Sequence, residues 1–202
     1  MSQFIIEMGS GNTCRNDIGK VREMIDAVVD ADTGQHEIVF KWQLFHFAPP
    51  NEPLLWCTFA YAYGYAAAFG YDTTASVFDF DSANFLASFD TPFIKIANQP
   101  RLWRLARQID GLKYISVNGQ LPRDIEEAVY MHCVSEYPAD AAEYQATTQI
   151  GHSTVSDHTI GWDLYWDWRP SIIEKHFVLE HDASNPDGGP FAVTPKQLAE
   201  VL

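Results

Sequence analysis

The chain has 202 residues and a mass of 22.8 kDa, a size that suits one domain. Hydrophobic residues make up 47% and aromatic residues 14%, which is enough apolar surface for a packed core and excludes an intrinsically disordered chain. The formal net charge of −14 repels phosphate backbones and anionic lipids, so neither nucleic acid nor a membrane is an expected partner. We expect residues 1–202 to form a single domain.

The cysteines and the N-terminus favour a cytoplasmic location. Cys14, Cys57 and Cys133 are odd in number and show no C-x-x-C spacing, which is typical of a reducing compartment. The sequence enters the apolar run Phe4-Ile5-Ile6 without a preceding basic segment, so we expect no signal peptide. No apolar run reaches the roughly 18 residues that a membrane-spanning helix needs.

Short β-rich runs alternate with helix-like stretches along the whole chain. The predicted strands are Phe4–Gly9, Glu37–Gln43, Tyr71–Phe78, Pro92–Asn98, Lys113–Gly119, Tyr130–Ser135, Thr154–Thr159 and Ser171–Leu179. The predicted helices are Asp17–Asp30, Leu54–Phe69, Ser82–Ser88, Arg101–Ile109, Arg123–Val129, Ala139–Gln149, Trp162–Trp168 and Lys196–Leu202. Eight β/α units indicate an α/β protein with a compact TIM (β/α)8 barrel, because an open doubly wound sheet usually has fewer strands.

Polar residues collect at the carboxyl ends of the predicted strands, where TIM barrels carry their active sites. A purely structural barrel would place Val, Ile or Leu at most inward positions. The polar strand-end residues are Glu7, Lys41, Gln43, Asp79, Lys95, Asn98, Asn118, Ser135, Tyr137, Ser156, Asp157, His158, Glu174 and His176. A ring of this kind predicts a functional site.

Two histidines end the seventh and eighth predicted strands, which lie about 4.8 Å apart in a sheet. On the same face, the imidazoles of His158 and His176 could share one divalent metal. Alternation along each strand places Ser156 with His158, and Glu174 with His176. Either histidine alone reads more simply as a satisfied polar residue at a strand end, and the pairing on neighbouring strands favours the metal. Mn²⁺, Mg²⁺, Fe²⁺ and Zn²⁺ all suit such a pair. His132 is expected to face the helix layer.

Two lysines interrupt apolar strands. An inward Lys41 or Lys95 is costly to desolvate unless an anion meets it, so the pair indicates a clamp for phosphate or carboxylate. The alternative is that each ammonium group reaches the barrel rim and stays in water. Lys175, between Glu174 and His176, should point outward by alternation and stays outside this clamp.

Several segments resemble the N-acetylneuraminate (sialic acid) synthase family, in the family's order and over nearly the whole chain. The most specific are Ser156-Asp157-His158-Thr159-Ile160-Gly161 and Ile173-Glu174-Lys175-His176-Phe177. The others are Phe4-Ile5-Ile6-Glu7-Met8-Gly9 with Asn12, Lys41-Trp42-Gln43, Lys95-Ile96-Ala97, His132-Cys133-Val134-Ser135 with Tyr137-Pro138, and Asn185-Pro186-Asp187. The resemblance implies a transferase of carbohydrate biosynthesis that condenses phosphoenolpyruvate with an N-acylated amino-sugar aldehyde, such as N-acetylmannosamine, to a nonulosonic acid and phosphate.

The same resemblance implies a role for each site residue. His158 and His176 would hold the metal, Mn²⁺ first and Mg²⁺ second, and would act as catalytic residues together with Glu7 and Asp187. The residues expected to bind substrate are Lys41, Gln43, Lys95, Asn98, Ser135, Tyr137 and Ser156. Glu7, Gln43 and Asp187 would contact sugar hydroxyls or position the attacking water.

The sequence departs from the family pattern on the sugar side. The family reads Lys-Ile-Ala-Ser-Gly-Glu where this chain reads Lys95-Ile96-Ala97-Asn98-Gln99-Pro100, so the sugar-contacting carboxylate is replaced by Pro100. The resemblance ends at Leu202, and we expect a barrel-only member without the family's C-terminal antifreeze-like domain. The alternative function is a reduced, non-catalytic barrel that binds a sugar acid, a phospho-metabolite or a protein partner.

Two further segments leave alternatives open. Trp162, Tyr165, Trp166 and Trp168 read as a helix-packing core, or as a patch between the subunits of a homodimer. The long segment Leu179–Pro195 reads as an exposed loop, or as a lid over the barrel mouth.

Overall fold

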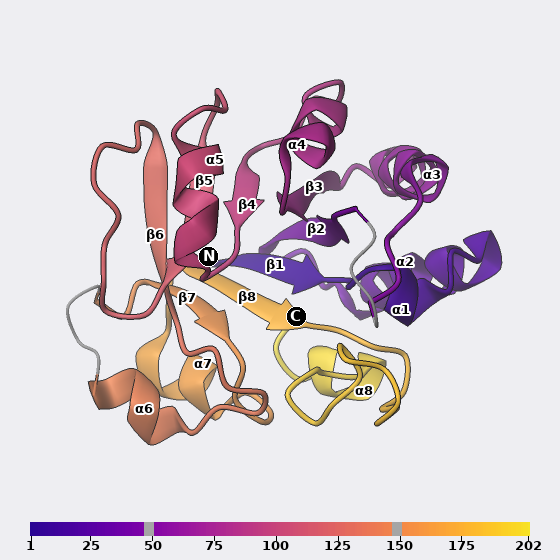
Figure 1. The fold of residues 1–202 in the computed structure, drawn as a ribbon. Coiled ribbons are helices and arrows are strands. Elements are labelled where there is room, and N and C mark those ends of the chain that lie inside the picture. Colours follow the sequence, from indigo (N-terminus) through magenta and orange to yellow (C-terminus); the bar gives the residue numbers. More distant parts are fainter. Residues whose placement is uncertain (47–50, 147–150) are drawn as a thin grey trace.

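The computed structural model describes residues 1–46, 51–146 and 151–202 and contains eight parallel strands that close into a barrel in sequence order (Figure 1). The strands are β1 (Gln3–Glu7), β2 (Glu37–Leu44), β3 (Asp72–Val77), β4 (Ile94–Ile96), β5 (Lys113–Val117), β6 (Ala128–Cys133), β7 (Thr154–Asp157) and β8 (Ile172–His176). The α/β class and the TIM-barrel architecture are therefore confirmed.

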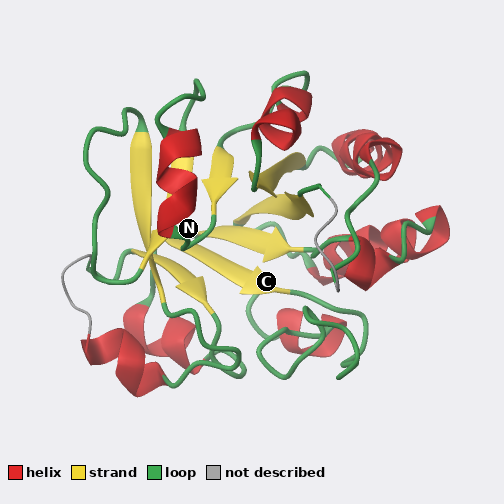
Figure 2. Ribbon diagram, in the orientation of Figure 1, coloured by secondary structure: helices red, strands yellow, loops and turns green. Residues whose placement is uncertain are grey.

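Helices lie outside the strands (Figure 2). They are α1 (Gly11–Cys14), α2 (Ile18–Ala31), α3 (Trp56–Ala68), α4 (Phe80–Leu86), η1 (Pro100–Leu102, a 3-10 helix), α5 (Trp103–Ala106), α6 (Ala141–Ala146), α7 (Asp163–Trp168) and α8 (Pro195–Leu198). Residues 147–149 of the predicted helix Ala139–Gln149 lie outside the described residues. No helix in the described ranges is long and apolar enough to cross a membrane.

The predicted helix Arg123–Val129 is wrong. Asp124 and Glu127 have positive φ angles of 59° and 49°, which a right-handed helix does not allow. Ala128 and Val129 instead pair with Lys113 and Tyr114 at the start of β6. The strand pairing that closes the barrel overrides the helix propensity of the Glu-Glu-Ala run, and β5 connects to β6 through a loop.

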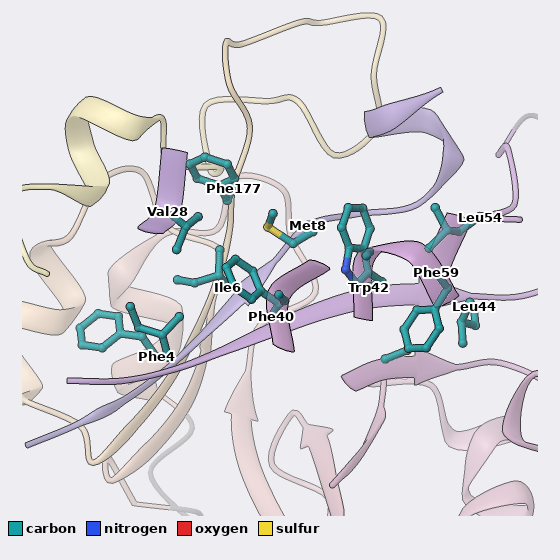
Figure 3. Packing of buried hydrophobic residues seen from close by; sticks show 14 of the residues in the cluster. Phe4, Ile6, Met8, Val28, Phe40, Trp42, Leu44, Leu54, Phe59 and Phe177 are labelled. Atoms are coloured by element: carbon teal, nitrogen blue, oxygen red, sulfur yellow. The ribbon is translucent and has the colours of Figure 1, made fainter. Parts of the chain in front are cut away.

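Alternate residues of each strand face the two sides of the barrel wall. Phe4, Ile6, Phe40 and Trp42 are fully buried and belong to the main hydrophobic cluster of the protein. Figure 3 shows Ile6 and Phe40 in this cluster together with Val28 of α2. The even-numbered residues of β1 and β2 thus bind the helices to the barrel.

The odd-numbered residues of the same strands point inward. Ile5, Val39, Phe93, Tyr114 and Met131 form a separate cluster inside the barrel, where the Phe93 and Tyr114 rings stack at 3.9 Å. This apolar layer fills the amino-terminal half of the interior. The next inward positions along β1 and β2 are Glu7 and Lys41, so the barrel becomes charged immediately above an apolar floor.

The predicted outward direction of Lys175 is confirmed. Its Nζ donates to Asp157 Oδ2 at 2.9 Å and to the Thr159 carbonyl at 2.6 Å, and it lies 5.7 Å from the Trp162 ring centroid. Both side chains of the Lys175–Asp157 pair are fully buried. This ion pair joins β7 to β8 on the helix side, directly behind the two strand-end histidines.

His132 and the aromatic cluster of the seventh helix also follow the predicted packing. The His132 ring lies 5.2 Å from Tyr144 and stacks on Trp168 at 5.7 Å, so it faces the helix layer as expected. Trp162 and Tyr165 are buried in the main cluster, whereas Trp166 is 42% exposed.

Removing the charge of Asp157 should strongly destabilise the barrel. Asp157→Asn leaves a buried ammonium group without a counter-charge, and we expect the free energy of unfolding to fall by about 3 kcal/mol. Urea unfolding at neutral pH measures this loss. Asp167→Asn, on the exposed face of α7, should change it by less than about 0.5 kcal/mol. Equal effects of the two changes would contradict the prediction.

Candidate active site at the carboxyl ends of the strands

A cavity of about 620 Å³ opens at the carboxyl ends of the strands. It brings together nearly all of the predicted site residues: Glu7, Lys41, Gln43, Lys95, Asn98, Tyr137, Ser156, His158, His176 and Asp187. Ser135 is exposed and lies outside this lining, but its hydroxyl accepts a hydrogen bond from Asn98 Nδ2 at 2.9 Å. Most of the strand-end pattern of the sequence therefore corresponds to one cavity, but Asn118 lies outside its lining and Asp157 faces the helix side, where it pairs with Lys175.

The floor of the cavity is a buried layer of two lysines and two glutamates. Lys41 forms an ion pair with Glu7, and its Nζ lies 3.7 Å from Glu174 Oε2. Lys95 Nζ lies 3.6 Å from the same oxygen. Each of the four residues is at most 4% exposed, so Lys41 and Lys95 point inward and do not reach water at the rim. The charges of the layer cancel, as buried ions require.

Three serines add hydrogen bonds to this layer. Lys41 Nζ donates to Ser76 Oγ at 2.9 Å, and Lys95 Nζ donates to Ser116 Oγ at 2.6 Å. The Ser156 hydroxyl donates to Glu174 Oε1 at 2.8 Å. The ammonium groups are thereby held at fixed positions above the apolar floor.

Burial and pairing shift the ionisation of the layer in opposite directions. Burial lowers the pKa of Lys41 to about 8, although the Glu174 carboxylate opposes this shift. Burial alone would raise the pKa of Glu174, but Lys41, Lys95 and the Ser156 hydroxyl outweigh it and lower that pKa to about 2. At neutral pH Glu174 is ionised and Lys41 is largely protonated.

His158 presents a defined nitrogen to the cavity. Its Nδ1 lies 2.6 Å from the Val134 carbonyl, which can only accept, so Nδ1 carries the proton. Nε2 is therefore the basic atom, and it lies 3.5 Å from Ser156 Oγ. Burial lowers the pKa of His158 to about 4, so the ring is neutral at physiological pH.

His176 lies beside it, with ring centroids 5.5 Å apart. Burial and the neighbouring His158 hold the pKa of His176 well below its ordinary value. Its Nδ1 is 3.6 Å from Asp187 Oδ1 and, among the described residues, has no hydrogen-bond partner. Because the ring is neutral, this contact is not an ion pair at neutral pH.

Asp187 reaches the cavity from the segment that follows β8. Gln43 Nε2 donates to its Oδ1 at 3.2 Å, and the Thr13 hydroxyl donates to its Oδ2 at 3.5 Å. Burial raises the pKa of Asp187, and the bond from Gln43 only partly opposes this. The segment predicted as a loop or a lid thus places one carboxyl group over the mouth.

The donor set fits a divalent cation as a pair of nitrogen ligands. Both imidazoles are neutral and buried; His158 Nε2 has only a long contact of 3.5 Å with Ser156 Oγ, and His176 Nδ1 has no hydrogen-bond partner among the described residues. The described ranges hold no group of three or more His, Cys, Asp or Glu side chains arranged around one point. Water or substrate oxygens would therefore supply the remaining ligands.

The structure adds residues that the sequence did not assign to the site. These are Ser76 and Ser116, which bind the two lysines, and Arg101, which lines the cavity beyond β4. Glu174, a member of the predicted strand-end ring, lies between those lysines. Period-2 alternation places Glu174 inward with His176, so its position was recognisable.

Comparison with solved structures defines the class of barrel. N-acetylneuraminic acid (sialic acid) synthetase from Leptospira borgpetersenii serovar Hardjo-bovis, in complex with citrate, matches with a TM-score of 0.75 and 21% identity over 98% of this chain and 80% of its own. Spore coat polysaccharide biosynthesis protein E from Chromobacterium violaceum matches with a TM-score of 0.75 and 19% identity, over 99% of this chain and 72% of its own. Spore coat polysaccharide biosynthesis protein spsE from Bacillus subtilis matches with a TM-score of 0.73 and 21% identity, over 98% of this chain and 65% of its own.

The chain thus has a sialic acid synthase-like TIM barrel. A more distant neighbour is a truncated 3-deoxy-D-arabino-heptulosonate 7-phosphate synthase from Thermotoga maritima, with a TM-score of 0.64 and 10% identity. A scan against protein-family models and a search of curated proteins gave no match.

Acid should destabilise the protein partly through His158. The folded-state pKa of about 4 is below the ordinary 6.5, so the unfolded state binds the proton first and stability is lost as pH falls through this window. From about pH 7.5 to pH 5 this loss is about 2 kcal/mol. Urea unfolding of His158→Gln should show a correspondingly shallower pH dependence. His181→Gln, at an exposed position, should keep the wild-type slope, and the same slope in His158→Gln would contradict the prediction.

Proposed function

We propose that the protein is a metal-dependent synthase that condenses phosphoenolpyruvate with an N-acylated amino-sugar aldehyde, similar to N-acetylmannosamine, giving a nonulosonic acid and phosphate. The observation that carries this proposal is one cavity holding two neutral imidazoles above a pair of buried lysines. Neighbours of the same fold, one of them a sialic acid synthetase, support it.

Phosphoenolpyruvate would bind against Lys41 and Lys95. Both ammonium groups are held by serines and face the cavity, so they can donate to carboxylate or phosphate oxygens without moving. Glu7 and Glu174 neutralise the lysines and would limit how tightly the anion is held. Ser156, Asn98, Ser135 and Tyr137 are the further groups proposed to bind this substrate.

The metal, Mn²⁺ first and Mg²⁺ second, would supply Lewis-acid polarisation of the aldehyde. In the proposed reaction, C3 of phosphoenolpyruvate attacks the aldehyde carbon, whose oxygen takes up a proton. Water adds at C2, and the resulting tetrahedral centre loses phosphate by cleavage of the C2–O bond.

The residues of the chain supply position and proton exchange. Glu7 and Gln43 would contact sugar hydroxyls. Asp187, whose pKa burial raises, is suited to exchange a proton with the water or with the aldehyde oxygen. Fixed ammonium groups and dipoles then stabilise the developing charge without reorganisation.

The second candidate is a barrel that binds a sugar acid, a phospho-metabolite or a protein partner without turnover. The observation that favours it is Pro100, which occupies the place of the family's sugar-contacting carboxylate and begins η1.

A cytoplasmic location, a homodimer and a single domain over 1–202 also stay predictions. Cys14, Cys57 and Cys133 are free thiols.

Ligand binding should raise the melting temperature. With Mn²⁺ and phosphoenolpyruvate at about 100 times their dissociation constants, stabilisation of about 2.7 kcal/mol per independent site corresponds to roughly 5–10 °C. His158→Ala and His176→Ala should abolish the contribution of Mn²⁺, whereas His181→Ala should keep it. An unchanged wild-type melting curve in scanning fluorimetry would count against the assignment.

Phosphate release distinguishes the two candidate functions. We expect release from phosphoenolpyruvate only with a divalent metal and a suitable aldehyde from a panel of N-acylated hexosamines. Lys95→Met should lower the rate at least about 100-fold through loss of an anion-binding group, whereas Lys196→Met, outside the cavity, should not. Binding of phosphoenolpyruvate without release under any condition would favour the non-catalytic barrel.

A further inference from the structure

One buried tyrosine outside the cavity is bonded to the backbone on both sides of the Asp157 peptide. Tyr144 of α6 is fully buried, and its hydroxyl donates to the Ser156 carbonyl at 2.6 Å. The same oxygen accepts a hydrogen bond from the His158 backbone N–H at 3.0 Å. The Tyr144 hydroxyl is therefore both a donor and an acceptor, and both of its partners are backbone groups between Ser156 and His158.

This contact compensates for the end of a strand. β7 ends at Asp157, so His158 lies just beyond the regular ladder that would otherwise fix its backbone. The His158 carbonyl accepts from the Ala139 N–H at 2.9 Å, and its Nδ1 bonds the Val134 carbonyl. The segment 134–144 thus holds the backbone N–H, the backbone carbonyl and the ring nitrogen of one residue.

The two histidines differ in this respect. Both rings pack against aromatic side chains, His158 against Tyr137 at 4.2 Å and His176 against Phe191 at 5.1 Å between centroids. The difference lies in the ring nitrogens: His158 Nδ1 is bonded to the Val134 carbonyl, whereas His176 Nδ1 has no hydrogen-bond partner among the described residues. His158 is therefore the fixed member of the pair. A ligand that is held in place from behind contributes more to metal affinity than one that must be ordered on binding.

We propose that Tyr144 is a positioning residue: its hydroxyl holds the His158 backbone so that Nε2 faces the cavity. The role in metal binding rests on the proposed function, because it requires that His158 bind the cation. Tyr144 does not touch the cavity itself. Its ring packs against His132 and Trp168 on the outer side of the barrel, and a phenylalanine keeps those contacts.

The test compares Tyr144→Phe with Tyr130→Phe. Tyr130 also donates its hydroxyl to a backbone carbonyl, that of Pro122, but at a point away from the histidines. Mn²⁺ binding is measured by calorimetry at a temperature where both variants are folded. We expect the dissociation constant to rise about tenfold or more in Tyr144→Phe and to stay within twofold of wild type in Tyr130→Phe.

A second measurement needs no metal. In the wild-type protein, nitrogen-15 NMR should show the proton of His158 on Nδ1, protected from exchange by the bond to Val134. In Tyr144→Phe this proton should exchange markedly faster, while in Tyr130→Phe it should not. An unchanged exchange rate, or an unchanged Mn²⁺ affinity, would overturn the role of Tyr144. Absence of Mn²⁺ binding by the wild type, with faster exchange in Tyr144→Phe, would instead refute the metal site and leave the positioning of the ring supported.

Discussion

The functional half of this barrel depends on the neutralisation of charge inside it. Two acidic and two basic side chains, Glu7, Lys41, Lys95 and Glu174, occupy a layer in which each residue is at most 4% exposed. A single unpaired ion at that depth would cost several kcal/mol, so the layer is stable only as a set. The serines on β3, β5 and β7 supply the bonds that the carboxylates and ammonium groups do not give each other. The position of each lysine is consequently determined by residues on other strands.

Above this layer, barrel closure and register determine which residues meet. Ser156 pairs with Glu174 along β7 and β8, and two positions further on the same alternation brings His158 beside His176. β8 in turn pairs with β1, which sets Glu7 opposite His176. The first and last strands of the chain thus share one corner of the cavity. No local interaction produces this corner, because it exists only when the cylinder is complete.

The sequence was informative where one rule governed each position. Alternation predicted that His158 and His176 face inward and Lys175 outward, and strand order predicted the barrel. It was least informative where tertiary pairing decides. Ala128 and Val129 follow helix-forming glutamates, yet they join β6 because β5 offers them a partner. Ser135 and Asn98 depend on loop geometry, which has no periodic signal, and the bond between them could not be foreseen. The sequence does not predict the contacts of Tyr144 either. Tyr144 occupies an ordinary buried position of a helix, and its hydroxyl bonds the backbone of Ser156 and His158 at the end of a neighbouring strand.

The segment after β8 is attached to the barrel at both of its ends. Phe177 donates to the Glu7 carbonyl, and Val193 donates to the His176 carbonyl, so the chain leaves and rejoins the cylinder at almost the same point. Between these anchors Pro186 and Asp187 line the cavity, and Gln43 and Thr13 hold the Asp187 carboxyl group. The segment between Phe177 and Val193 is therefore tethered to β1 and β8 at both of its ends. Because this segment carries Asp187 into the cavity lining, the position of its carboxyl group is set by the same two strands that carry Glu7 and His176.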